Sequence, residues 1–527
     1  MTLHQDRSRT TGGFGRTRAG LGDWRDPTLA AMLAAVATLP GLWLPFLSDD
    51  WAHLAAVAEG PALRTPFGYY RPLCMIIYWL DRLVWGLSPS LFHLTNLVLI
   101  GSAAALVVVL VRRYTGDPAL AGAAGILFGL HPYHIESAAW IAALADPLFS
   151  LLFLSAALAY DRWRARTRAL PITALLLFEA SLLAKETAVT LPVFLVFLGL
   201  GDKRRRPQAA EWGRGLLPMA AVALVHFVVL RPWGLGEPGL SFLGQFRVQW
   251  VKNLALFGAA AILPAHTEVI EAHPKLWVSL AALAATALTL VVLTARRRIP
   301  AVAWAAMPAF AILVGPSVIS FQERYLFLPS AASALGLAAL LNTAGRRARA
   351  VAAGLLVAGW IVSAGDHWIG WCDGGRASRR LIADLVEASA HPGAQEIVVA
   401  NMPHRVHGAP VAADYSAAVT VSGGRPVAVR TGIAIDYPVP EADALDGSFS
   451  SAVSRPPPFA EIRLRIPHQR YSRYVWPLPV PESKRIEREW AVILLDSTGG
   501  IRVRIPPAPG GTRSAYVWSR GRLEPVF

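Results

Sequence analysis

The sequence predicts a polytopic α-helical membrane protein with about eleven transmembrane helices, followed by a β-rich domain. Of its 527 residues, 54% are apolar and only 16% are charged, whereas soluble proteins carry roughly 25% charged residues. Apolar stretches of membrane-spanning length recur as far as residue 366, with arginine clusters between them. After about residue 367, proline, glycine and short β-type segments replace the long apolar runs.

Eleven segments are apolar enough to be drawn as spans. The first is expected to remain as an anchor, because its apolar run exceeds the roughly 7 to 15 residues of a signal-peptide core. A weaker segment at 249–264 is either a short span or a re-entrant helix. The eleven lie at about 27–47, 91–111, 118–133, 146–160, 169–184, 187–201, 215–231, 277–295, 300–319, 326–342 and 350–366.

The basic residues predict the orientation, since short cytoplasmic loops retain Lys and Arg. If 249–264 does not cross, every basic cluster lies on one side. These clusters are Arg7 to Arg25, Arg112 with Arg113, Arg162 to Arg168, Lys203 to Arg206, Arg296 to Arg298, and Arg346 to Arg349. We therefore expect an inner (plasma) membrane protein with a cytoplasmic tail at 1–26, a transmembrane catalytic domain at 27–366 and an extracytoplasmic domain at 367–527. The net charge of +15 is then a topology signal and does not indicate nucleic-acid binding.

The region after residue 367 is predicted to be a sandwich-like β module. An amphipathic helix is expected from Arg376 to Ala390, because Leu381, Ile382, Leu385 and Val386 form one stripe. Strands are expected at 396–400, 418–421, 426–435, 460–466, 490–495, 501–505 and 515–519, between turn-forming residues. Cys74 and Cys372 would both lie near the outer face, as packing residues or as a disulfide.

Ionisable residues gather where the expected spans meet the outer surface. Asp49 and Asp50 directly follow the first span, and acids at such a boundary are candidates for function. Further groups at the same depth are Arg71, His93 and Asn96, then His131, His134 and Glu136, then Lys185 and Glu186, and finally Glu323 and Arg324. Together they predict one wet cavity on the extracytoplasmic side.

These groups suit glycosyl transfer from a lipid-phosphate sugar. An attacking hydroxyl must lose a proton, and Asp49 or Asp50 can act as the general base; repulsion between the two carboxylates is expected to raise one pKa. The phosphate leaving group needs cations and hydrogen-bond donors, which Arg71, Lys185 and Arg324 can supply without a metal or other cofactor.

Residues 40–345 resemble the tetratricopeptide-repeat transmembrane O-mannosyltransferases and their bacterial relatives, which have the GT-C fold. Besides the two aspartates, the resemblance rests on the segments 70–73, 92–97, 130–137, 183–187 and 323–330. It implies an inverting transferase that moves a hexose from a polyprenyl-phosphate carrier to a hydroxyl of a protein, glycan or lipid acceptor. The hexose that it implies is mannose. It also implies that Asp49 is the base and Asp50 supports it.

The resemblance further implies that Arg71, His131, His134, Glu136, Lys185, Glu186, Glu323 and Arg324 bind the donor, and that Tyr70, His93, Asn96 and Asp146 contact substrate. Two features depart from the family. Ala143-Leu144-Ala145-Asp146 stands where Gly-Arg-x-Asp is common, so the arginine is missing. The β-rich module stands where the repeats are expected, which leaves the acceptor open.

Several simpler interpretations remain. The two aspartates can cap a helix, and His131 and His134 can pack at the interface or bind a metal. Lys185 with Glu186 can be a snorkelling pair at a span end, and Glu323 with Arg324 can be a local ion pair. A transporter or lipid-linked-sugar flippase would also have many spans, although its binding groups would lie near the bilayer midplane. A non-catalytic scaffold is the third class.

Overall fold

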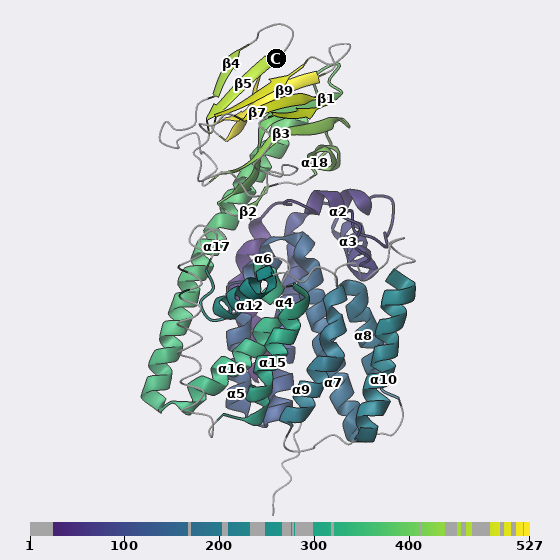
Figure 1. Ribbon diagram of the computed structural model, residues 1–527, viewed down its shortest axis with the longest axis vertical. Helices are drawn as coiled ribbons and strands as arrows, with labels where there is room; N and C mark the ends of the chain where they lie inside the picture. Colours follow the sequence, from purple (N-terminus) through teal and green to yellow (C-terminus); the bar gives the residue numbers. More distant parts are fainter. Residues whose placement is uncertain are drawn as a thin grey trace, which may run out of the picture.

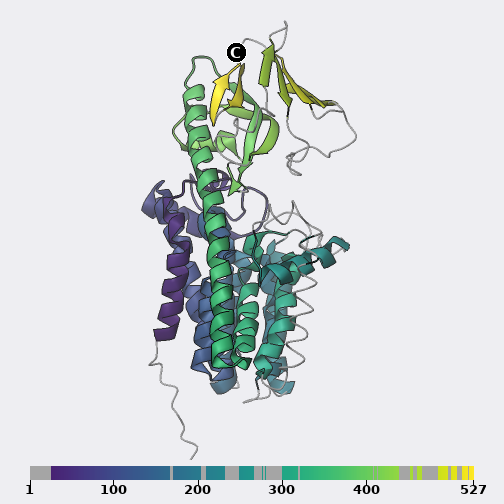
Figure 2. The same cartoon turned by 90° about the vertical axis from the view of Figure 1, so that its left-hand side faces the viewer.

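The computed structural model describes residues 25–166, 170–202, 209–231, 248–265, 276, 279, 299–317, 321–407, 409–411, 414–437, 451–454, 460–465, 485–495, 500–506, 513–519 and 521–526. A helical bundle forms one end of the molecule and a β-rich module forms the other (Figure 1). Helix α17 runs along the side of the bundle and continues into the module (Figure 2).

Helices account for nearly all of the bundle. In chain order they are α1 (Arg25–Thr38), η1 (Leu39–Trp43), α2 (Asp50–Ala56), α3 (Pro72–Trp85), α4 (Pro89–Thr115), α5 (Pro118–Gly129), α6 (His134–Ala139), η2 (Ile141–Leu144), α7 (Ala145–Arg166), α8 (Ile172–Ala184), η3 (Glu186–Thr190), α9 (Leu191–Gly201), α10 (Ala209–Val225), the π-helical turn η4 (His226–Leu230), α12 (Val248–Ala260), α15 (Ala301–Val314), η6 (Gly315–Ser317), η7 (Glu323–Leu326), α16 (Pro329–Thr343) and α17 (Arg346–Ser389).

Four helices among the described residues are long and apolar enough to cross a membrane. They are Pro89–Thr115, Ile141–Ala165, Glu211–Leu230 and Arg346–Ser389. Shorter apolar helices coincide with other expected spans, while 277–295 lies almost entirely outside the described residues. The membrane-protein class is thus supported, and the number of eleven crossings stays a prediction.

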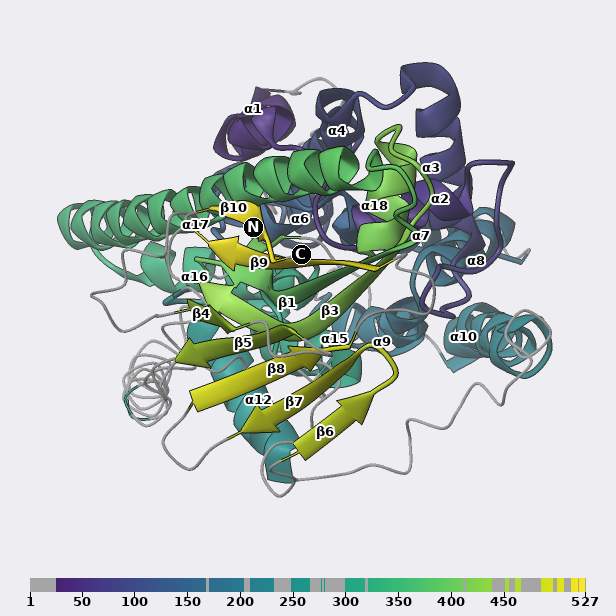
Figure 3. The same ribbon diagram turned by 90° about the horizontal axis from the view of Figure 1, so that it is seen from above.

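Helix α12 covers most of the weak segment at 249–264 and lies across the bundle. It is seen nearly end-on in Figure 1 and lengthwise from above in Figure 3. This orientation differs from that of the bundle helices and agrees with a segment that does not cross.

The loops that carry the polar motifs are placed by close packing of α1, α4 and α5. A Cβ at Gly125 of α5 would lie 2.1 Å from a Val108 methyl of α4, and one at Gly129 would lie 3.0 Å from the Ala34 Cβ of α1. Small residues let helix backbones approach in this way. The chain leaving α1 toward Asp49 and the chain leaving α5 toward His131 therefore start side by side.

The module contains two five-stranded sheets. The first is mixed and has the order β10 (Arg522–Pro525), β9 (Arg513–Ser519), β1 (Glu396–Val406) and β2 (Ala409–Pro410), with β3 (Ala428–Tyr437) also paired to β1. The second is antiparallel and has the order β4 (Ser451–Ser454), β5 (Ala460–Arg465), β8 (Gly500–Ile505), β7 (Ala491–Leu495) and β6 (Arg485–Arg488).

Strand β1 is the centre of the first sheet. It pairs in parallel with β3 from Glu396↔Ala428 onward and with β9 from Glu396↔Arg513 onward. Seven consecutive residues of β1 are buried, which is typical of a parallel strand covered on both faces. Helices α17 and α18 (Tyr415–Val421) pack on this sheet, so the prediction of strands and of an amphipathic helix agrees with the structure but misses α18.

One strand prediction for this region is wrong, and one predicted boundary lies within a helix. The strand expected at 418–421 is wrong, because these residues belong to α18, whose N-cap Asp414 accepts a hydrogen bond from Ala417 N at 2.9 Å. A crossover is needed there because β1 and β3 are parallel. The expected boundary at 366/367 falls inside α17, which is one continuous helix of 44 residues; its outer part includes the predicted amphipathic helix.

Candidate active site

The two aspartates after α1 lie in different surroundings. Asp50 is fully buried, and its carboxylate accepts hydrogen bonds from Leu47 N at 2.8 Å and Ala142 N at 2.7 Å. Asp49 is the N-cap residue of α2 but makes no side-chain capping bond; its Oδ1 accepts instead from Ser48 Oγ at 3.3 Å. Asp50 therefore connects the turn to the segment before α7, whereas the Asp49 carboxylate has one hydrogen bond, from Ser48.

Burial is the main electrostatic influence on both acids. It raises the pKa of Asp50 well above its usual range, and the neighbouring Asp49 charge adds only a smaller effect. Burial also raises the pKa of Asp49, while the Arg324 charge and the Ser48 hydrogen bond oppose the increase. The expected repulsion between the two carboxylates therefore contributes to the raised pKa of Asp50, but loss of water contact contributes more.

Arg71 and Glu186 form a two-bond ion pair across 115 residues. Arg71 Nη2 lies 2.8 Å from Glu186 Oε1, and Arg71 Nε donates to Glu186 Oε2 at 3.2 Å. The Arg71 guanidinium also lies 4.7 Å from the centroid of the Tyr69 ring. Both charged side chains keep some exposure, 18% and 25%, so a ligand in this region can reach them.

A second set of charges joins α6, α7, α8 and η7. Lys185 Nζ donates to Asp146 Oδ1, and Arg324 Nε lies 3.7 Å from the other oxygen of Asp146. Arg324 also donates to Glu136, from Nη1 at 2.5 Å and from its backbone N at 2.8 Å. Four ionisable side chains from four distant motifs therefore share one cluster.

These contacts change the interpretation of the neighbouring charged residues. Lys185 forms its ion pair with Asp146, and Glu186 forms its ion pair with Arg71. Glu323 Oε2 lies 3.1 Å from Nε2 of His367 in α17, and the next residue, Arg324, contacts Glu136. The simpler interpretations of these two neighbouring pairs are therefore wrong. Each charged residue pairs with a residue far away in the sequence, and these pairs connect separate helices.

Aromatic rings flank the cations. The Arg324 guanidinium lies 4.4 Å from the Trp140 ring and 5.2 Å from the Tyr325 ring, and Lys185 Nζ lies 4.6 Å from the Tyr325 ring. Cations gain electrostatic stabilisation over such ring faces. Trp140, Tyr325 and His367 were not among the predicted site residues; the sequence signal for His367 was an ionisable residue at the end of an apolar run.

The two histidines after α5 are buried among other rings. His134 Nε2 is 2.9 Å from Ser330 Oγ, and the His131 ring lies 5.0 Å from that of Trp360. Both side chains are almost completely buried, with exposed fractions of 2% for His131 and 1% for His134. Among the residues that the structure describes, no group of three or more His, Cys, Asp or Glu side chains could hold a metal ion.

The residues predicted to contact substrate lie in different parts of the site. His93 Nδ1 lies 2.8 Å from Ala138 O, and Asn96 Nδ2 donates to Ser137 O at 2.9 Å, so both side chains face the backbone of α6. Tyr70 is 8% exposed, and its ring lies 6.2 Å from that of His226. Asp146 belongs to the charge cluster. The two cysteines are free, and Cys74 Sγ donates to Ala184 O at 3.2 Å.

The chain is similar to known glycosyltransferases of membranes. It is 36% identical over 129 residues to protein O-mannosyl-transferase TMTC1 of Homo sapiens, which covers 23% of this chain and 13% of that protein. It is 34% identical over 168 residues to TMTC1 of Mus musculus, covering 29% and 17%, and 38% identical over 154 residues to Tmtc2 of Drosophila melanogaster, covering 26% and 16%. The resemblance predicted from the motifs is thus confirmed, although the matches span less than a fifth of those relatives.

The chain also resembles a solved structure, but it matches no family model. The solved structure of ArnT from Cupriavidus metallidurans in the apo state aligns over 81% of this chain and 95% of that chain, with a TM-score of 0.47 and 14% identity. The curated relatives are named as transferases, which does not favour the transporter or flippase alternative.

Proposed function

We propose that this protein is an inverting glycosyltransferase that moves a hexose from a polyprenyl-phosphate carrier to a hydroxyl on the extracytoplasmic face. Mannose is the hexose that we propose. The observation that carries the proposal is the proximity of two ion-paired sets, Arg71 with Glu186 and Lys185 with Asp146 and Arg324, of which Arg324 acts electrostatically on Asp49. A protein hydroxyl is the first acceptor to test, because the relatives are named protein O-mannosyl-transferases.

The proposed reaction assigns Asp49 as the base. The acceptor oxygen attacks the anomeric carbon while its proton passes to Asp49, and the bond from that carbon to the phosphate oxygen breaks with its electron pair going to the phosphate. Attack from the face opposite the phosphate inverts the anomeric centre. A positioned base of this kind contributes roughly 10²- to 10⁴-fold in rate.

The cations are proposed to stabilise the phosphate. Arg71 and Arg324 can share their N–H groups between their carboxylate partners and a phosphate, because a guanidinium has five donors. Their acids hold them in place and balance their charge when no donor is bound. Preorganised donors of this kind stabilise developing charge without reorganisation during the reaction.

A membrane-borne carrier agrees with the surroundings of this site. An apolar cavity of about 190 Å³ lies between α12, α15 and α16, lined by residues such as Ile262, Met307, Phe310 and Leu337. Helix α16 begins three residues after η7, which carries Arg324. A prenyl chain in this cavity would therefore enter close to the charge cluster.

The proposal is tested by direct assay of sugar transfer. Purified protein is incubated with labelled polyprenyl-phosphomannose and peptides that contain serine and threonine, with glycan and lipid acceptors in parallel. We expect label in an acceptor with wild-type protein and a loss of at least about 100-fold with Asp49→Asn. Full turnover in both Asp49→Asn and Asp50→Asn would contradict the catalytic assignment.

The proposed topology has its own test. The N-terminus is proposed to be cytoplasmic and residues 377–527 extracytoplasmic, in an inner membrane. Cysteines introduced into the module should react with an impermeant reagent added to intact cells. Labelling only after lysis would contradict this orientation.

A further inference from the structure

The C-terminal module touches the segment that carries the aspartates. Ser48 N donates to Val411 O, just after β2, at 3.0 Å, and Ser378 Oγ of α17 donates to Phe46 O at 3.3 Å. Helix α18 of the module packs against α2, which begins at Asp50. The Asp49 turn therefore has the membrane domain on one side and the module on the other.

The turn needs such a restraint because Ser48 has an unusual backbone conformation. Its φ is +47°, in the left-handed region that non-glycine residues seldom adopt. A residue persists there when its surroundings fix it, and such residues are concentrated at functional sites. The hydrogen bond from Ser48 N to Val411 O is one such contact, and the Asp50 bonds to Leu47 N and Ala142 N are others.

Two adjacent glycines of α17 bring the module close to this turn. A Cβ at Gly374 would lie 2.7 Å from the Ala409 Cβ of β2, and a Cβ at Gly375 would lie 3.0 Å from Pro45 Cδ. One glycine thus admits the β1–β2 hairpin and the next admits the chain that leads to Asp49. Asp373, just before them, contacts His407 Nδ1 of the same hairpin at 3.1 Å.

We propose that the β1–β2 hairpin, residues 396–411, is a positioning element of the candidate active site: seated on Gly374, it holds Ser48 so that the Asp49 carboxylate faces Arg324. This inference rests on the proposed function for the role of Asp49. The hairpin is internally braced, because Val411 N donates to His404 O at 3.0 Å. The charge of His404 also lowers the pKa of Asp49, which agrees with a hairpin that faces this carboxylate.

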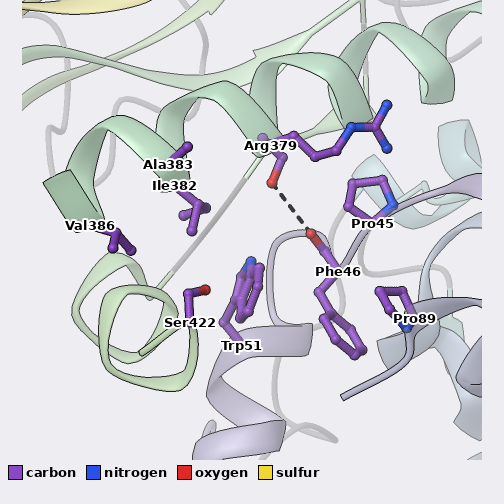
Figure 4. A pocket seen from close by; sticks show the side chains of 10 residues that line it. Pro45, Phe46, Trp51, Pro89, Arg379, Ile382, Ala383, Val386 and Ser422 are labelled. Carbon is purple, nitrogen blue, oxygen red and sulfur yellow. Dashed lines mark hydrogen bonds between the residues drawn. The ribbon is translucent and has the colours of Figure 1, made fainter. Parts of the chain in front are cut away.

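The junction is not closely packed throughout. A cavity of about 330 Å³ lies between α17, α18 and α2, lined by Phe46, Trp51, Ile382, Val386 and Ser422 among others (Figure 4). At this cavity, close packing does not add to the restraint that the hairpin and α18 provide.

The test displaces the hairpin from a distance with Gly374→Ala. The added methyl at 2.7 Å from Ala409 Cβ requires a shift, and a misplacement of about 1 Å can cost roughly 100-fold in rate. We expect kcat to fall about 10- to 100-fold while the donor KM changes less than about twofold. Amide hydrogen exchange in the segment around Ser48 should become faster.

Two further variants separate positioning from loss of folding. Gly365→Ala on the same helix is the matched control, because a Cβ there meets nothing within 4 Å, and it should leave kcat and exchange unchanged. The double variant Gly374→Ala with Ala409→Gly removes the closest contact and should restore both. If amide exchange around Ser48 is unchanged in Gly374→Ala, the inference is overturned, even if no transfer is detected with any acceptor. If the wild-type protein shows no transfer, only the proposed function is contradicted. Wild-type kcat in Gly374→Ala despite faster exchange would also overturn it.

Discussion

The buried ion pair between Lys185 and Asp146 allows a demanding test of the charge cluster. Both side chains are about 5% exposed, and Arg324 Nε is 3.7 Å from the same carboxylate. Asp146→Asn keeps the shape of the side chain and removes its charge. Because loss of one partner leaves the other charge buried and uncompensated, the free energy of unfolding should fall by about 3 to 5 kcal/mol.

The same change should alter the pH dependence of donor binding. Burial lowers the pKa of Lys185 from its usual value, and Asp146 opposes this effect. Without Asp146 the ammonium should lose its proton as the pH rises toward and above neutrality. Loss of one charge-assisted bond to phosphate, about 1.5 to 3 kcal/mol, corresponds to a rise in donor KM of roughly 10- to 100-fold.

The assay measures donor KM between pH 5.5 and 9 together with the midpoint of thermal denaturation. In Asp146→Asn, KM should stay near the wild-type value at low pH, where Lys185 is protonated, and increase at high pH. Asp161→Asn at the other end of α7 is the matched control: its partner Arg113 is 51% exposed, so solvent screens that pair and KM should not change. A pH-independent KM in Asp146→Asn would refute the proposed role of Lys185.

Three further predictions concern the two ends of the site. Asp49→Asn should lower kcat at least about 100-fold with little change in stability. Asp50→Asn should lower the free energy of unfolding by about 1 to 3 kcal/mol, because an amide cannot accept from both buried N–H groups. Equal melting midpoints for the two variants would argue against this difference. Ser48→Ala removes a hydrogen bond that lowers the pKa of Asp49, so the acid limb of the kcat/KM profile should move to higher pH, and an unmoved limb would count against Asp49 as the base. Arg71→Lys keeps the charge but not the two-bond geometry toward Glu186, and a roughly tenfold increase in donor KM is expected, which donor titration would detect or exclude.

Local patterns in the sequence were sufficient for the membrane class and for the choice of motifs. Apolar length predicted the helical membrane class, and ionisable residues at span ends predicted a candidate site with Asp49, Arg71, Lys185 and Arg324. The difference between Asp49 and Asp50 was not accessible in this way. It depends on the N–H group of Ala142, which is 92 residues away in the chain.

The errors had a similar origin in long-range structure. Residues 418–421 have β-type composition, yet the parallel pairing of β1 and β3 requires a crossover, and Asp414 caps a helix there. The composition change near residue 367 marks where α17 ceases to be strongly apolar, although the helix itself continues. The partners of Lys185 and Glu186 were also not predicted, because the sequence does not reveal that Asp146 and Arg71 lie next to their charged atoms.

The continuous helix α17 carries the C-terminal module away from the helical bundle (Figure 2). Its 44 residues correspond to roughly 66 Å, about twice the thickness of the hydrocarbon core of a bilayer. Near its middle, Trp360 Nε1 and Ser363 Oγ donate to Ile262 O and Pro264 O at 3.0 and 2.6 Å, so the helix is fastened to the bundle below the module. Under the proposed function, an acceptor anchored in the same membrane would have to bring its hydroxyl to the level of Asp49, so the length of its tether would help to determine substrate choice.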